Sequence, residues 1–262
     1  MASAITTGFG RRLAGFLSKS LPGYRRLDTV AVEDIAKVLE TGDVVLVEGN
    51  TRISVAIKYL TQSSWSHACL YVGDRGASCA EPTLLEADLQ DGVRLVPLDH
   101  YRDFNLRICR PNALSDRDRQ ELIDFARAKL GHQYDLKNVV DLVRFLVQRP
   151  AVPQRYRRAM IAFGSGEPTR AICSTLIAET FQSVGYPILP LRDENGEQGV
   201  DGGVGKDGEV PVYYRRHFTH FTPRDFDLSP YFHVIKPTLE RGFDYQQVEW
   251  EEPVTASSDH TQ

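Results

Sequence analysis

The sequence is poor in cysteine, methionine and tryptophan, with 4, 2 and 2 copies in 262 residues. The cysteines form neither a C-x-x-C pair nor the compact framework of a small disulfide-rich domain; they are Cys69, Cys79, Cys109 and Cys173. Such spacing favours free thiols in a reducing compartment.

Basic tracts and long apolar runs are also missing. The formal net charge is −4, and no cluster of lysine and arginine is long enough to follow a phosphate backbone, so nucleic acid is not an expected partner. No stretch approaches the roughly 20 apolar residues of a transmembrane helix. The apolar residues near the start are interrupted by Gly10–Arg12 and Lys19, so a signal peptide is not expected. We expect a cytoplasmic protein without cofactors.

Residues 5–20 have a weakly amphipathic pattern. Apolar side chains fall near one helical face, with basic residues elsewhere on the turn; the apolar set is Ile5, Phe9, Leu13, Phe16 and Leu17. One interpretation is an interfacial helix that makes weak contact with a membrane surface. The other, which we favour at this length, is a helix that docks on the domain or a frayed terminus.

The length suits one domain with a substantial core. We predict an N-terminal segment at 1–28, a main domain at 29–252 and a disordered tail at 253–262. Within the domain, insertions are expected at about 149–170, which contains prolines and a basic run, and at 191–210, which is rich in Gly, Asp and Glu without apolar periodicity. The second insertion lacks the ligand spacing of an EF-hand, so no metal is assigned there.

A helix is predicted over residues 171–186. Its apolar residues recur at helical spacing and Gly185 suits the C-cap; they are Leu176, Ile177, Phe181 and Val184. Cys173 then lies in the first turn, where the helix dipole favours the nucleophilic thiolate. The alternative is a buried cysteine that packs as a small hydrophobic residue. The polar neighbours Ser174 and Thr175 favour the first interpretation.

His67 follows a polar turn and begins a short strand that ends at Gly73. Because side chains alternate along a strand, His67 can face a cleft while Ala68, Leu70 and Val72 pack on the other side. Further strands are predicted at 44–47, 83–88, 92–97, 105–110 and 231–235, with helices at 29–39, 50–60, 115–130 and 137–148.

Five motifs occur in an order that resembles the YiiX/YebB-like branch of the NlpC/P60 superfamily: Gly42-Asp43-Val-Val-Leu46, Trp65-Ser-His67 with Tyr-Val-Gly-Asp74, Leu85-Glu86-Ala87, Gly131-His-Gln-Tyr134-Asp135 and Cys173-Ser-Thr-Leu176. The resemblance extends over about residues 40–236. It implies an α+β, circularly permuted papain-like fold, with an antiparallel sheet or small barrel packed against helices.

The resemblance also implies a site. Cys173 is expected to be the nucleophile, His67 the general base and Glu86 the residue that orients His67. Asp88, two residues further along the same face, is the main rival of Glu86. Tyr134, Ser174 and Trp65 are the predicted substrate-binding residues, although Tyr134 could equally be a buried structural tyrosine.

Three functional hypotheses stay open. The first is a cysteine hydrolase or acyltransferase that acts on an amide or ester of a peptide or acyl lipid. The second is a lipid- or peptide-binding module without catalysis, because a fold does not establish an activity. The third is a metal site formed by His67 and Cys69 on one face of a strand. It ranks last, because the sequence shows no further ligands at metal-site spacing.

Overall fold

The computed structural model describes six parts of the chain: residues 15–27, 30–74, 82–88, 91–133, 172–190 and 215–250. Several predictions fall outside the described residues: Tyr134, the helix at 137–148, the insertions at 149–170 and 191–210, and the tail at 253–262.

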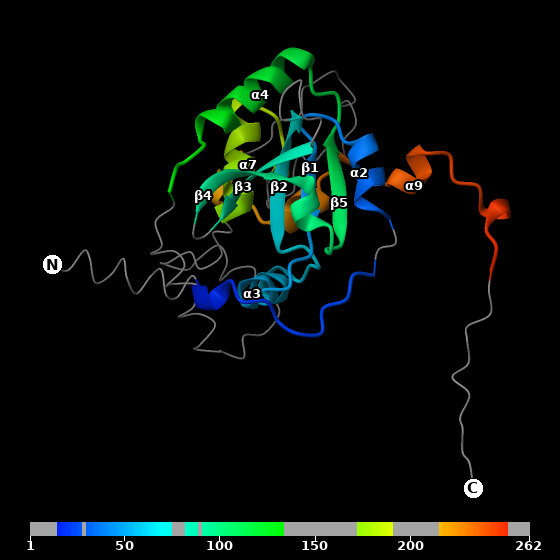
Figure 1. Cartoon of the computed structure of the whole chain (residues 1–262). Helices are drawn as coiled ribbons and strands as arrows, with labels where there is room; N and C mark the ends of the chain where they lie inside the picture. Colours follow the sequence, from blue (N-terminus) through cyan, green and yellow to red (C-terminus); the bar gives the residue numbers. More distant parts are fainter. Residues whose placement is uncertain are drawn as a thin grey trace, which may run out of the picture.

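The described residues form a six-stranded sheet with the order β4-β3-β2-β1-β5-β6 (Figure 1). Every neighbouring pair is antiparallel. The predicted α+β class is confirmed, and the sheet is open rather than a closed barrel. Its strands are β1 Val44–Val47, β2 His67–Asp74, β3 Pro82–Asp88, β4 Gly92–Pro97, β5 Leu106–Pro111 and β6 Phe232–Ile235.

The sheet separates two hydrophobic clusters, because successive side chains of a strand point to opposite faces. Along β2, Ala68, Leu70 and Val72 belong to one cluster, and Cys69 and Tyr71 to the other. This alternation agrees with the prediction. The central strand β1 is buried on both faces, which explains why it consists of four consecutive apolar residues.

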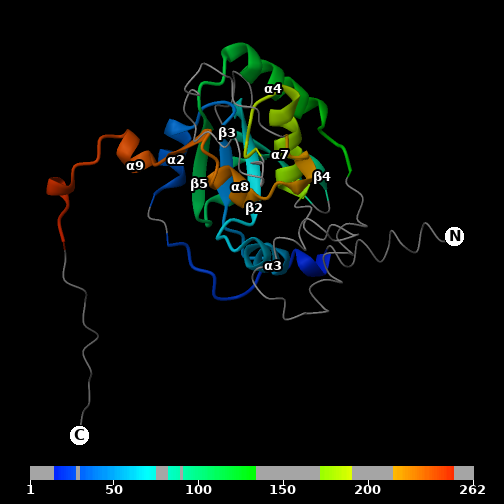
Figure 2. The ribbon, with the colours of Figure 1, turned by 180° about the vertical axis from the view of Figure 1, so that it is seen from behind.

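Helices cover both faces and one end of the sheet. On one face lie α4 (Asp116–Ala128), α7 (Ile172–Ser183) and the short α8 (Pro223–Asp227), which Figure 2 shows in front of the strands. The other cluster includes residues of α2 (Val32–Val38) and of the 3-10 helix η1 (Leu98–Tyr101), and α3 (Arg52–Thr61) lies at one end of the strands (Figure 1). The remaining short elements are η2 Phe218–His220, α9 Pro237–Glu240 and η3 Tyr245–Gln247.

The two longest described helices begin and end close to the predicted positions. Ser115 caps α4 by accepting a hydrogen bond from the Asp118 backbone N–H, as a capping residue should. The helix α7 ends at Ser183, and Gly185 follows with a φ of +72°, which glycine adopts without strain. The α7 side chains predicted to be apolar pack over β2 and β3, so the helix start is anchored to the strands of His67 and Glu86.

None of the helices in the described parts of the chain is long and apolar enough to cross a membrane.

Candidate active site

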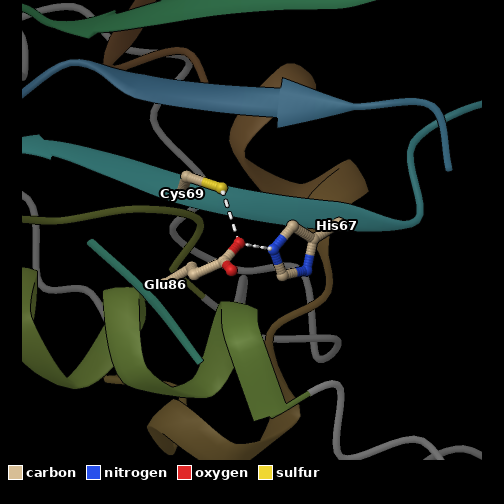
Figure 3. A group of neighbouring side chains, drawn as sticks. All are labelled: His67, Cys69 and Glu86. Carbon is tan, nitrogen blue, oxygen red and sulfur yellow. Dashed lines mark hydrogen bonds and ion pairs between the residues drawn. The ribbon is translucent and has the colours of Figure 1, made fainter. Parts of the chain in front are cut away.

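His67 and Glu86 meet because β2 and β3 are neighbouring antiparallel strands. The His67 Nε2 atom lies 2.8 Å from the Glu86 Oε2 atom (Figure 3). The rival Asp88 lies instead 3.9 Å from the Arg94 guanidinium. The predicted contact between Glu86 and the imidazole is therefore present, while a catalytic role for Glu86 stays a prediction.

Two residues that the sequence analysis missed hold the Glu86 carboxylate. Arg94 stands opposite Glu86 in the β3–β4 register, and its Nε donates to Glu86 Oε1 at 2.9 Å. The Tyr101 hydroxyl, from η1, donates to Oε2. Glu86 is only 1% exposed, and burial opposes its ionisation, but the contacts with His67, Tyr101 and Arg94 hold its pKa well below the usual range. The carboxylate is therefore charged beside the imidazole.

Cys173 lies in the first turn of α7 and is 5% exposed. Burial opposes ionisation of its thiol. This effect is outweighed by the charge of His67, by a hydrogen bond with that ring and by backbone hydrogen bonds from Ala68 and Ser174, so the pKa of Cys173 is lowered. The structure thus brings the thiol and the imidazole together at the start of a helix.

The His67 ring lies between these groups and is partly accessible, with 22% of its side chain exposed. Burial disfavours the imidazolium, but the sulfur atoms of Cys69 and Cys173 raise the pKa of His67 well above the ordinary value. Because Nε2 faces Glu86, Nδ1 is the ring nitrogen left for Cys173. A carboxylate beside Nε2 favours the tautomer that carries its proton on this nitrogen and its lone pair on Nδ1.

Cys69 is a second sulfur in the site. Its Sγ lies 3.6 Å from Glu86 Oε2 (Figure 3), and burial is the main reason that its pKa is raised to about 11. The ligand atoms of His67, Cys69 and Glu86 all lie within 4.8 Å of one another. The sequence offered only two of these ligands for a metal hypothesis, and the fold adds Glu86 as the third.

Of the predicted substrate-binding residues, Trp65 and Ser174 are described and both are buried. The Trp65 indole N–H donates to Asp227 at 3.2 Å, and the Ser174 hydroxyl donates to the Phe221 carbonyl at 2.7 Å. Both polar groups are engaged inside the protein. A role of either residue in substrate binding stays a prediction, and Ser174 contacts the Cys173 thiol through its backbone.

This arrangement suits nucleophilic catalysis. A thiol with a lowered pKa, an imidazole within hydrogen-bond reach and a carboxylate on the far ring nitrogen are the three parts of a cysteine nucleophile unit. Backbone N–H groups in the first turn of a helix have no acceptor within the helix, so those of α7 are suited to stabilise negative charge that develops on a bound carbonyl oxygen.

Comparison with protein families finds a match over residues 38–144 to the permuted papain-like amidase enzymes, the YaeF/YiiX, C92 family. The matched residues include His67 and Glu86 and end before Cys173. Comparison with curated proteins finds no match. Among solved structures, the chain is similar to the metalloprotein yiiX from Escherichia coli O157:H7, with 17% identity, a TM-score of 0.45 and coverage of 75% of this chain and 96% of that one.

The predicted resemblance to YiiX-like proteins of the permuted papain fold is confirmed by the family match. The wider assignment to the NlpC/P60 superfamily stays a prediction.

Proposed function

We propose that this protein is a cysteine-dependent hydrolase that cleaves amide bonds, with Cys173 as nucleophile, His67 as general base and acid, and Glu86 as the residue that orients His67. The observation that carries the proposal is the position of His67 between a thiol of lowered pKa and a buried carboxylate. The description of the matching family as amidases supports the same reaction class.

The proposed reaction has two stages. The Cys173 thiolate attacks the carbonyl carbon, and backbone N–H groups at the start of α7 stabilise the oxyanion. The His67 imidazolium protonates the leaving amine, and a thioester to Cys173 remains. His67 then takes a proton from water, which attacks the thioester, and the thiolate leaves as the acid product is released.

Glu86 contributes through its contact with Nε2. A charged carboxylate at this nitrogen keeps a proton there and stabilises the imidazolium that forms when Cys173 ionises. Tyr101 and Arg94 hold the carboxylate in turn, so the orientation of the ring depends on hydrogen bonds from η1 and β4.

The substrate class requires an experiment. We favour an amide over an ester because of the matching family, and both peptides and N-acyl lipids contain amide bonds. The purified protein should be incubated with matched series of peptides, N-acyl amides, and esters with the same acyl groups. Product release identifies the bond, and transfer of the acyl group to added amine or alcohol distinguishes an acyltransferase.

Intact mass spectrometry under rapid acid quench should show an acyl adduct that peptide mapping places on Cys173. Cys109→Ala is the matched control, because Cys109 is a buried thiol in β5. Adduct formation that survives in Cys173→Ala would refute the assigned nucleophile. Binding without turnover across all three series would support a binding module instead.

A further inference from the structure

Three side chains of the site lie close enough together to bind one metal ion, a use that the amide hydrolysis proposed above does not involve. His67 and Cys69 are two residues apart on β2, and Glu86 reaches them from β3 (Figure 3). The distance from Glu86 Oε2 is 2.8 Å to His67 Nε2 and 3.6 Å to Cys69 Sγ, and no two of the three atoms are more than 4.8 Å apart. Ligands around one tetrahedral ion lie at similar separations, so small side-chain movements bring all three atoms to one centre.

We propose that His67, Cys69 and Glu86 form a binding site for a thiophilic divalent metal ion such as Zn²⁺, and that metal binding and amide hydrolysis exclude each other. The first half of the proposal stands on the cluster alone, and the second half rests on the proposed function.

The donor set selects the class of ion. An imidazole, a thiolate and a carboxylate are the usual ligands of Zn²⁺, and three protein ligands leave a fourth position for water. The thiolate disfavours Mg²⁺ and Ca²⁺, which prefer oxygen ligands. On binding, the Cys69 thiol releases its proton to solvent, and the partly exposed His67 ring provides the route of entry.

The neighbours of Glu86 are arranged to support this use. Arg94 binds Oε1, whereas Oε2 is the oxygen that faces His67, Cys69 and Tyr101. The guanidinium and the metal ion would therefore share the carboxylate through different oxygens. Tyr101 would remain hydrogen-bonded to the ligating carboxylate, which is the usual outer support of a metal site.

A metal ion bound at this site would stop the proposed amide hydrolysis, because it would change the protonation of the His67 ring. A metal ion on Nε2 takes the lone pair there, so the neutral ring keeps its proton on Nδ1. Nδ1 then cannot accept the Cys173 proton, and its N–H is a weaker acid than that of an imidazolium. The base and the acid of the proposed mechanism are both lost.

The test uses chelator-treated full-length protein titrated with Co²⁺, followed by competition with Zn²⁺. We expect one equivalent to bind, with the thiolate-to-Co²⁺ absorption band in the near ultraviolet. Cys69→Ser should abolish this band, whereas Cys173→Ala should keep it, because the ligating sulfur belongs to Cys69. Tyr101→Phe should weaken binding about tenfold or more as an outer partner of Glu86.

Three outcomes would overturn the metal site: no saturable binding to the parent protein, a band lost in Cys173→Ala but kept in Cys69→Ser, or equal affinity in the parent and in His67→Ala. These readings need no substrate, so they are independent of the hydrolase proposal. Turnover in chelator tests the hydrolase separately. Inhibition by Zn²⁺ that follows the Co²⁺ occupancy supports mutual exclusion, and full turnover at saturating Zn²⁺ refutes it.

Discussion

The start of α7 and the middle of the sheet each bury a cysteine, with opposite consequences for the thiol. Cys109, in β5, is fully buried, and burial is the main cause that raises its pKa to about 12. Cys173 is 5% exposed and meets the same opposition from burial, yet its pKa is lowered. The difference comes from the imidazole of His67 and from two backbone N–H groups, that of Ala68 in β2 and that of Ser174 in α7.

Cys69 shows that proximity to His67 is not sufficient. It also contacts the imidazole, but burial and the nearby Glu86 charge raise its pKa to about 11. For Cys173, the backbone N–H groups of Ala68 in β2 and Ser174 in α7 add to the effect of the imidazole and lower the pKa. The low pKa of the Cys173 thiol therefore depends on the surrounding backbone as well as on the imidazole.

The largest expected effect is on turnover. Cys173→Ala and His67→Ala should each lower kcat by about a hundredfold or more, and the double variant should be little worse than either, since the two residues act as a unit. Cys109→Ala should keep full turnover, measured on the best amide of the substrate series. Additive losses in the double variant would show that the two residues do not act together.

The next largest effect is expected from the loss of the Glu86 carboxylate. Glu86→Gln should lower kcat/KM by roughly tenfold or more, because the neutral amide neither fixes the ring tautomer nor stabilises the imidazolium. The alkaline limb of the pH profile should also move to lower pH. Asp88→Asn is the matched control and should leave both readings nearly unchanged. Equal losses in the two variants would indicate a general charge effect rather than the specific contact with His67.

Most of the site around His67 and Cys173 could be predicted from the sequence, because the local hydrophobic patterns agree with the fold. Alternation placed His67 on the face opposite Ala68, and helical spacing placed Cys173 in a first turn. The link between Cys173 and His67 came from the family resemblance, because no local pattern relates residues that are so far apart in the chain. The predicted strands, and the predicted helices that fall within the described residues, lie close to their expected bounds, whereas the short α8, α9 and 3-10 helices were not predicted.

The residues around Glu86 were missed for different reasons. Arg94 could have been found, since pairing the predicted strands across the short turn places it opposite Glu86. Tyr101 could not, because it reaches Glu86 from a 3-10 helix whose position depends on packing. Cys69 was seen as a possible ligand of a metal, but its contact with Glu86 depends on the β2–β3 register.

A smaller effect concerns thiol ionisation. Because the pKa of Cys173 is lowered and the pKa of His67 is raised, the thiolate–imidazolium pair should persist to lower pH than an isolated thiol would allow. Iodoacetamide labelling of Cys173 should fall as pH decreases through its lowered pKa, with a midpoint below the ordinary thiol value of about 8.5. In His67→Ala the midpoint should move upward. Faster labelling of Cys69 or Cys109 at neutral pH would contradict the assignment.

The smallest expected effect is a loss of stability at Cys109, which tests whether this residue contributes to packing alone. Its sulfur is buried in the cluster beneath α4 and α7, so Cys109→Ala should lower the free energy of unfolding by about 1 kcal/mol through the lost contacts and the small cavity. Cys109→Ser should cost more, because the smaller side chain also buries a hydroxyl. Urea denaturation measures both changes, and turnover per folded molecule should match the parent in each. A loss of turnover without a loss of stability would mean that Cys109 contributes to the chemistry, and burial in the sheet would then no longer distinguish it from Cys173.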